Sequence, residues 1–229
     1  MKNYDIPTIV VLDSGIGGVA VLNKLIENQI YCNYIYIADN DFMPYGNKNR
    51  TKIQNRAREL IDYIFKKYNP DFIIVACNTM SSCAKIDDNR VIVMKFIKSK
   101  QYLATRLTKK NLKDFNVISD CRLASLIEKN HLNEIKMSRT IQHIVQHKNL
   151  GCCKNLVLGC THYELCERQF ANLIEGNVEC NSKFILPDIK RRLKRYNIHS
   201  ELNVVVETTR RSFVVDQKIF NLISNRNDW

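Results

Sequence analysis

The segment IIVACNTMSSC, residues 73–83, is an apolar run that ends at a cysteine followed by small polar residues. The segment LVLGCTHYELC, residues 156–166, repeats this pattern, and in both segments a second cysteine comes six positions after the first. Short, nearly continuous apolar runs of this kind are typical of parallel strands that are buried on both faces. We therefore predict two equivalent strands, one ending at Cys77 and the other at Cys160.

Strands and helices alternate along most of the chain. Further strand-like runs occupy residues 8–14, 31–40 and 202–208, and apolar residues recur at helical spacing over residues 18–29, 49–68, 128–147 and 210–223. This alternation predicts an α/β fold with a doubly wound parallel sheet, whose ligand sites lie beyond the carboxyl ends of the strands. Residues 91–120 fit two strands, but the spacing between them is too short for a full crossover helix.

The size and composition are those of an ordinary globular protein. A chain of 229 residues forms one large α/β domain or two small ones. No apolar run is long enough to span a bilayer, and the N-terminal apolar stretch runs directly into Asp13 and Gly15, unlike a signal peptide. We expect a cytoplasmic protein without a membrane partner.

The formal charge of +12 is the unusual feature of the composition. Such a charge is compatible with nucleic acid, an anionic membrane surface or acidic small molecules as partners. Because no nucleic-acid-binding signature accompanies the basic residues, we favour a solvated basic surface.

The nine cysteines predict free thiols, since their number is odd and disulfides are rare inside cells. None of their spacings suits a zinc site, so we expect no metal. Cys32, Cys152, Cys153 and Cys180 are interpreted as packing or surface residues.

The sequence DSGIGG, residues 13–18, joins a predicted strand to a predicted helix. It lacks the third glycine of a dinucleotide-binding loop. Backbone N–H groups at a helix N-terminus can instead bind an anion such as a carboxylate. Asp13 can orient a neighbouring group or bind an ammonium group there; alternatively, it only caps the turn.

The two cysteines at strand ends carry the chemical hypothesis. A thiol beside a helix N-terminus tends to have a lowered pKa. The neighbouring Asn78, Thr79, Thr161 and His162 supply hydrogen-bond donors for a carboxylate. One such thiol would suggest a nucleophile, whereas two facing thiols can remove a proton from one side of a carbon and return one from the other. The pattern therefore predicts racemisation without a cofactor; the alternative is a pair of buried cysteines before helix caps.

The segments VVLDSGIGGVAVL, YIADNDFMPYGNK, IIVACNT and LVLGCTHYEL occur in the order found in glutamate racemases of the aspartate/glutamate racemase superfamily, and the chain resembles this family. The resemblance implies two similar doubly wound α/β domains related by pseudo-twofold symmetry, with the active site in the cleft between them. Residues 1–96 and about 187–229 would form the first domain, which carries Cys77. Residues of about 97–186 would form the second, shortened domain, which carries Cys160.

The resemblance also implies an isomerase that interconverts L- and D-glutamate without a cofactor and so supplies D-glutamate for peptidoglycan synthesis, cell-wall biogenesis and cell shape. Cys77 and Cys160 match the family's acid–base cysteines, and Asp13 and His162 match the residues that assist them. The substrate-binding positions match Asp13, Ser14, Tyr45, Gly46, Asn78, Thr79, Thr161 and His162, with weaker matches at Thr105, Thr108 and Glu128. Glutamate is the implied small-molecule partner, no nucleic acid is expected, and a homodimer is compatible.

The chain departs from the family pattern in its middle. It is shorter than usual between Val93 and Tyr102 and again after Thr108, and HYEL, with Glu164, stands where the family has HYPL. Loss of a connecting helix would uncover one sheet face and loosen domain closure. Two alternatives therefore stay open: a related aspartate or hydantoin racemase, and an inactive relative that acts as a basic binding protein.

Overall fold

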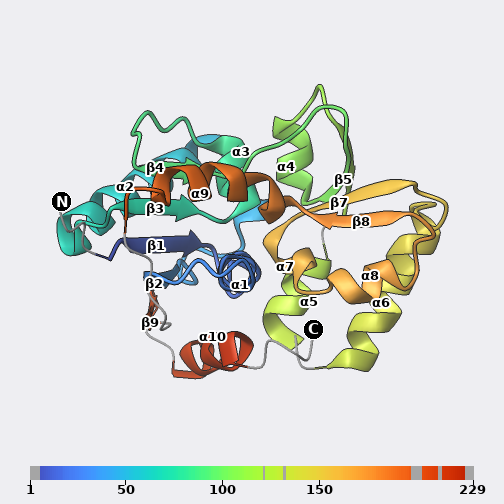
Figure 1. The fold of residues 1–229 in the computed structure, drawn as a ribbon. Helices are drawn as coiled ribbons and strands as arrows, with labels where there is room; N and C mark the ends of the chain where they lie inside the picture. The colour runs from blue at the N-terminus through green and yellow to red at the C-terminus, as the bar shows by residue number, and fades with distance from the viewer. Residues whose placement is uncertain (1–5, 121, 131–132, 197–202, 211–212, 225–229) are drawn as a thin grey trace.

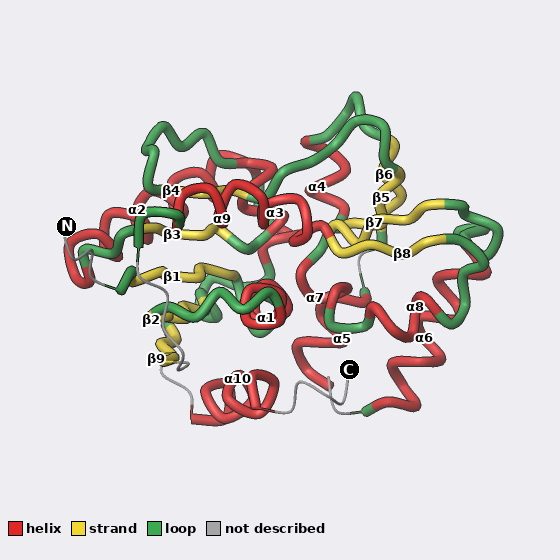
Figure 2. The backbone as a smooth tube through the Cα atoms, viewed as in Figure 1, coloured by secondary structure: helices red, strands yellow, loops and turns green. Residues whose placement is uncertain are grey.

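A computed structural model describes residues 6–120, 122–130, 133–196, 203–210 and 213–224. Two separate parallel sheets with surrounding helices make up the protein (Figures 1 and 2). The first sheet has the strand order β4 (Val91–Val93), β3 (Phe72–Val75), β1 (Thr8–Asp13), β2 (Asn33–Ala38) and β9 (Asn203–Thr208). The second has the order β6 (Asn116–Ser119), β5 (Gln101–Ala104), β7 (Asn155–Gly159) and β8 (Asn177–Cys180). The predicted α/β class with parallel sheets is confirmed.

The helices lie on both sides of the sheets (Figure 1). Their bounds are α1 (Val19–Glu27), α2 (Arg50–Tyr68), α3 (Asn78–Cys83), α4 (Arg106–Asn111), α5 (Leu123–Asn130), α6 (Glu134–His147), α7 (Thr161–Glu164), α8 (Glu167–Ala171), α9 (Leu186–Leu193) and α10 (Phe213–Ser224), with short 3₁₀ turns η1 (Tyr45–Asn47) and η2 (Asn181–Ile185). Within the part of the chain that the structure describes, no helix is both long enough and apolar enough to cross a membrane.

The central strands are buried on both faces, which explains their continuous apolar sequences. In β1, Val10 pairs in register with Ile73 of β3, and both side chains are fully buried. Helix α2 covers one face of this sheet and is capped at its N-terminus by Asn49, whose side chain accepts a hydrogen bond from the Lys52 N–H. Its C-terminus is capped by Asn69, which adopts the left-handed conformation with φ of 41°. Strand, cap and helix are therefore all encoded locally.

Two predictions about secondary structure are wrong. Residues 91–120 contain three strands instead of two, and β4 and β5 belong to different sheets, so no crossover helix is needed between them. The single helix expected over residues 128–147 is two helices, α5 and α6, because the Asn133 side chain caps a new helix by accepting from the Lys136 N–H. Strand β8 was not predicted.

The chain crosses between the two sheets twice, through residues 94–100 and residues 181–185. Ionic and aromatic contacts join these crossings and their flanks. Lys95 Nζ lies 3.9 Å from Asp188 Oδ2, and Lys100 Nζ lies 2.7 Å from Glu179 Oε2. Lys100 also lies over the ring of Phe184, 6.0 Å from its centroid. The two crossings therefore run side by side.

The shortened middle does not uncover the second sheet, contrary to expectation. Phe96, Leu112, Phe115 and Phe184 pack against a buried cluster that includes Tyr102. The rings of Phe96 and Tyr102 lie 5.7 Å apart, and the Tyr102 hydroxyl accepts a hydrogen bond from the Ile97 N–H at 2.8 Å. Aromatic side chains thus cover the sheet face that the loss of a connecting helix was expected to expose.

Replacing Phe96 with alanine should lower the free energy of unfolding by about 2–3 kcal/mol, because the variant loses apolar burial and leaves a gap above Tyr102. Urea unfolding measures the change. Ile97→Ala is the matched control in the same loop, since that side chain is 37% exposed and should change stability by well under about 1 kcal/mol. Equal losses in the two variants would contradict the packing role of Phe96.

Candidate active site between the two sheets

The glycine loop after β1 brings the two halves of the molecule into contact. Asp13, fully buried at the end of β1, accepts hydrogen bonds from the Gly15 N–H at 3.0 Å and from Thr161 Oγ1 at 3.2 Å. A Cβ atom on Gly17 would fall 2.5 Å from His162 Nδ1 and 2.6 Å from Thr161 Oγ1. Glycine is required at this position because α7 of the second half approaches the backbone so closely.

Burial raises the pKa of Asp13, although the nearby His162 acts in the opposite direction. Glu128 raises this pKa further through charge repulsion. The proton affinity of this carboxyl is therefore higher than that of a solvated aspartate, which makes it a better proton acceptor for a neighbouring acid.

Cys77 lies between β3 and α3 and is 4% exposed. Its sulfur accepts a hydrogen bond from the Met80 N–H at 3.5 Å, as a helix cap does, and its thiol donates to Ser14 Oγ at 3.6 Å. The strand end thus directs the thiol at the DSG segment that follows β1.

The prediction of a lowered thiol pKa is wrong for Cys77. Burial raises its pKa strongly, and the charges of Asp13 and Cys160 raise it further. The N–H of Met80 and the hydroxyl of Ser14 act in the opposite direction but do not outweigh burial. The two cysteines are linked through the end of β1, because Ser14 binds the Cys77 thiol and the adjacent Asp13 binds Thr161, which follows Cys160.

The second cysteine, Cys160, is 5% exposed at the end of β7, and it raises the pKa of His162, two positions further along the chain. His162 Nε2 lies 2.7 Å from Glu128 Oε2, and the same oxygen accepts from the Ile16 N–H at 3.1 Å. Burial alone would lower the pKa of His162, but Cys160 and Glu128 raise it well above its usual value. Burial would raise the pKa of Glu128, yet His162 lowers it. An imidazolium–carboxylate pair therefore lies behind Cys160.

Replacing Glu128 with glutamine should lower the pKa of His162 and destabilise the protein at neutral pH by about 2 kcal/mol, because a charge-assisted hydrogen bond is lost. The raised His162 pKa stabilises the fold below the ordinary histidine pKa of 6.5, and this contribution is lost as the pH rises through the folded-state value. NMR titration of the imidazole measures the change. Glu134→Gln, on the exposed start of α6, is the control; an unchanged His162 titration in Glu128→Gln would contradict the pairing.

Asn78 and Asn181 form a buried amide pair between α3 and η2. The Asn181 Nδ2 group donates to Asn78 Oδ1 at 2.5 Å. The Asn78 Nδ2 group is buried and has no hydrogen-bond partner among the described residues. Because an unpaired buried donor is unfavourable, this group is poised to bind an acceptor beside Cys77. Sequence analysis did not identify Asn181, since nothing in its local sequence indicates proximity to Asn78.

Three threonine hydroxyls join the two halves between α3 and α4. Thr79 Oγ1 lies 2.9 Å from Thr105 Oγ1 and 3.3 Å from Thr108 Oγ1, and the latter two are 2.9 Å apart. Thr79 belongs to α3, whereas Thr105 and Thr108 belong to the cap and first turn of α4. Thr105 and Thr108, the weaker matches to the family's substrate-binding positions, therefore lie beside Thr79, which is a stronger match.

Tyr45 and Gly46 lie in η1, after β2. The Tyr45 hydroxyl donates to Asp39 Oδ2 at 2.6 Å, and Arg56 binds the same carboxylate through two nitrogens at 2.6 and 2.9 Å. The Tyr45 phenol is therefore committed to Asp39, while Gly46 faces open space. The anchoring role of Arg56 was not predicted, because helical spacing alone does not reveal a partner at the end of β2.

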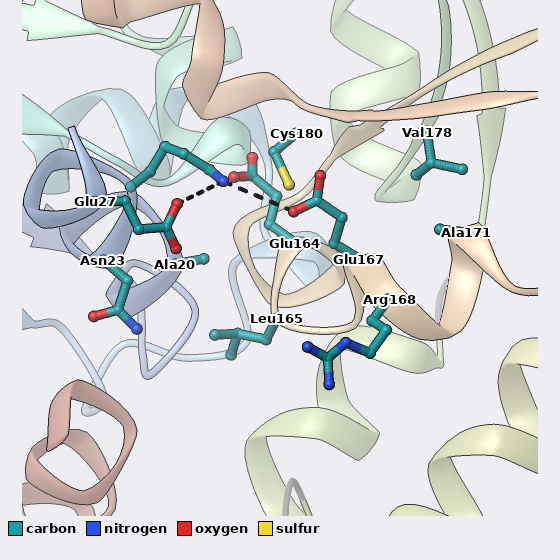
Figure 3. Close-up of a pocket in the computed structure, with 11 residues that line it drawn as sticks. Ala20, Asn23, Glu27, Glu164, Leu165, Glu167, Arg168, Ala171, Val178 and Cys180 are labelled. Atoms are coloured by element: carbon teal, nitrogen blue, oxygen red, sulfur yellow. Dashed lines mark hydrogen bonds and ion pairs between the residues drawn. The ribbon is translucent and has the colours of Figure 1, made fainter. Parts of the chain in front are cut away.

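A second buried carboxyl group lies outside this constellation. Glu164, at the HYEL departure, accepts hydrogen bonds from Ser182 Oγ at 2.5 Å and the Ser182 N–H at 3.2 Å. Burial raises the pKa of Glu164 to about 8. It lines a cavity of about 340 Å³ that also contains the ion pair of Lys24 with Glu27, 2.9 Å apart, and that neither Cys77 nor Cys160 lines (Figure 3).

The arrangement around the two sulfurs can perform proton transfer. Each thiol has a distinct ionisable neighbour, Asp13 for Cys77 and His162 for Cys160. Within the described ranges, no group of three or more His, Cys, Asp or Glu side chains is arranged to hold a metal ion.

Comparisons with known proteins give consistent results. No protein-family model matches the chain. A curated glutamate racemase of Buchnera aphidicola subsp. Acyrthosiphon pisum is 26% identical over 85% of this chain and 86% of its own. Two solved structures share the fold. A glutamate racemase from Campylobacter jejuni has a TM-score of 0.78, 20% identity and coverage of 95% of this chain and 98% of its own. One from Francisella tularensis in complex with D-glutamate has a TM-score of 0.75, 21% identity and coverage of 96% and 95%. The resemblance expected from the motifs is confirmed.

Proposed function

We propose that this chain, similar in sequence and fold to proteins named glutamate racemase, interconverts L- and D-glutamate without a cofactor. The observation that carries the proposal is that two buried thiols, Cys77 and Cys160, follow strands of the two sheets and are linked through Asp13 and Ser14, with Asp13 and His162 as their ionisable neighbours. A general acid and a general base on opposite faces of one carbon are what racemisation by proton transfer requires.

In the proposed reaction, Cys77 removes the α-proton of D-glutamate and Cys160 delivers a proton to the opposite face; in the reverse direction, the two cysteines exchange roles. The active form holds one thiolate and one thiol, so the rate should have a bell-shaped pH dependence. Asp13, with its raised pKa, accepts the proton of Cys77 as the thiolate forms. The protonated His162 stabilises a thiolate at Cys160.

The α-hydrogen of an amino acid is weakly acidic, so the site must stabilise negative charge that develops next to the carboxylate. The unpartnered Asn78 Nδ2 supports this proposal as a donor to that carboxylate. The hydroxyls of Ser14, Thr79 and Thr161 supply further donors close to the sulfurs. We include Tyr45 and Gly46 as one wall of the site, and Thr105, Thr108 and Glu128 as supporting residues.

Because both thiols are almost completely shielded from solvent, substrate entry requires the two halves to separate. We propose that separation occurs between a domain of residues 1–96 with about 187–229 and a domain of about 97–186. A cytoplasmic location, a homodimeric state and supply of D-glutamate for peptidoglycan synthesis remain predictions from the family resemblance.

The test is proton exchange in D2O. With wild-type protein, ¹H NMR should show loss of the α-proton signal of L-glutamate and of D-glutamate, and circular dichroism should decay to zero from either enantiomer. Parallel reactions with L-aspartate and with a hydantoin distinguish the related racemases. No exchange with any of these substrates would contradict the proposal and favour a non-catalytic binding protein.

A further inference from the structure

A cavity of about 660 Å³ lies next to the candidate active site, beyond the carboxyl ends of β5 and β6. Ligands of parallel α/β sheets bind at this end of the strands. The cavity is lined from both halves: Gly46 and Lys48 come from the segment after β2, and Thr105, Arg106 and Lys110 come from the start and body of α4. Its lining does not include either thiol.

The lining of this cavity is strongly cationic. Lys48, Arg106 and Lys110 face it together with one carboxylate, Asp120. One oxygen of the Asp120 carboxylate is already engaged, because Oδ1 accepts hydrogen bonds from the N–H groups of Arg122 and Leu123 at 2.8 and 2.9 Å. Among the residues that the structure describes, the three cations have no carboxylate partner within ion-pair distance. Lys48 is oriented by the ring of Phe42, whose centroid is 4.3 Å from its Nζ.

Thr105 connects the cavity with the candidate active site. Its side chain lines the cavity, and its Oγ1 lies 2.9 Å from Oγ1 of Thr79, which is two positions after Cys77. An anion held by the three cations would therefore be separated from the Cys77 side of the site by a layer of threonine hydroxyls.

We propose that this cavity, which we call the Lys48–Arg106–Lys110 cavity, captures a dicarboxylate substrate before it reaches the buried thiols. The proposal rests on the proposed racemase function and identifies the substrate's path. Cations grouped in a concave site concentrate an anionic ligand and raise its association rate, and salt weakens this effect. Three cations against a single, partly occupied carboxylate match a ligand with two carboxylate groups better than a ligand with one.

The test compares the double variant Arg106→Gln/Lys110→Gln with the control Lys109→Gln. Lys109 is an exposed lysine of the same helix that does not line the cavity. At low ionic strength, kcat/KM for L-glutamate should fall about tenfold in the double variant, with the loss expressed mainly in KM, and should stay unchanged in the control. The difference should shrink as NaCl is raised toward about 1 M, where the screening length is about 3 Å. Equal kinetics of the double variant and the control at low salt would overturn the proposal.

A binding experiment separates this proposal from the proposed function. Glutarate has two carboxylates but no chiral centre, so its binding can be measured by calorimetry even if the protein does not racemise glutamate. The double variant should bind glutarate about tenfold more weakly than Lys109→Gln does. Binding of inorganic phosphate with the same dependence on Arg106 and Lys110, without binding of glutarate, would overturn the assignment to a dicarboxylate.

Discussion

Cys160→Ser should racemise glutamate about a thousandfold more slowly than the wild type, and Cys77→Ser should lose a similar factor. A serine hydroxyl is too weak an acid to replace a thiol in either proton transfer, and general acid–base catalysis contributes about 10²- to 10⁴-fold to a rate. Decay of circular dichroism from each enantiomer measures the loss. Cys83→Ser, the same substitution at a buried cysteine at the other end of α3, should retain activity within about threefold.

The remaining exchange in D2O should be specific for one enantiomer in each variant. Cys77→Ser keeps the thiol proposed to deprotonate L-glutamate, so L-glutamate should exchange its α-proton without forming D-glutamate. Cys160→Ser should show the opposite preference. Unchanged racemisation in either variant would contradict the two-thiol mechanism, whereas exchange of both enantiomers in one variant would show that a different base acts.

Glu164→Gln should remove a pH dependence of stability between about pH 4.5 and pH 8. The pKa of Glu164 is about 8 in the folded protein and about 4.5 in the unfolded chain. The folded state therefore retains a proton that the unfolded state releases, and the wild type loses stability as the pH rises through this window. One pKa unit corresponds to about 1.4 kcal/mol, so the total loss attributable to Glu164 is about 5 kcal/mol.

Glutamine at this position can still accept a hydrogen bond from Ser182 but does not titrate. The variant should gain stability relative to wild type progressively between about pH 4.5 and pH 8. Urea unfolding at a series of pH values measures this gain. Glu175→Gln, which removes an exposed carboxylate that does not line this cavity, is the control and should not reproduce the gain. Parallel pH profiles of wild type and Glu164→Gln would contradict the assignment of the buried proton to Glu164.

The parts of the fold with strong local signals were predictable from sequence. Strand β3 is a run of four buried apolar residues, and α2 has both a capping asparagine and apolar residues at helical spacing. Strand β8, with the sequence NVEC, has an exposed first residue and a single fully buried one, so its composition does not distinguish it from a loop. Pairing with β7 defines it, and such pairing is a property of the tertiary structure.

The candidate site also combines features that the local sequence predicts with features that only the tertiary structure provides. Residues adjacent to strand ends, such as Asp13 and Cys77, could be proposed because parallel strands present their carboxyl ends at one edge. The partners that determine their protonation come from distant segments, as Glu128 does for His162. The depth of burial is likewise a tertiary property, which is why local sequence predicted a lowered pKa for Cys77 and the folded protein raises it.

The paired crossings between the sheets restrict how the protein can open. A single connection would let the two halves tumble freely, but residues 94–100 and 181–185 run side by side and are held together by Lys100 with Glu179 and Phe184. Two adjacent tethers define an axis, and the easiest motion about it is a hinge rotation. In the proposed opening, contacts between the two halves separate and re-form as substrate enters, among them the threonine contacts between α3 and α4 and the Asp13–Thr161 hydrogen bond. A cross-link between residues 94–100 and residues 181–185 should therefore preserve the proposed racemisation, whereas a cross-link between α3 and α4 should stop it.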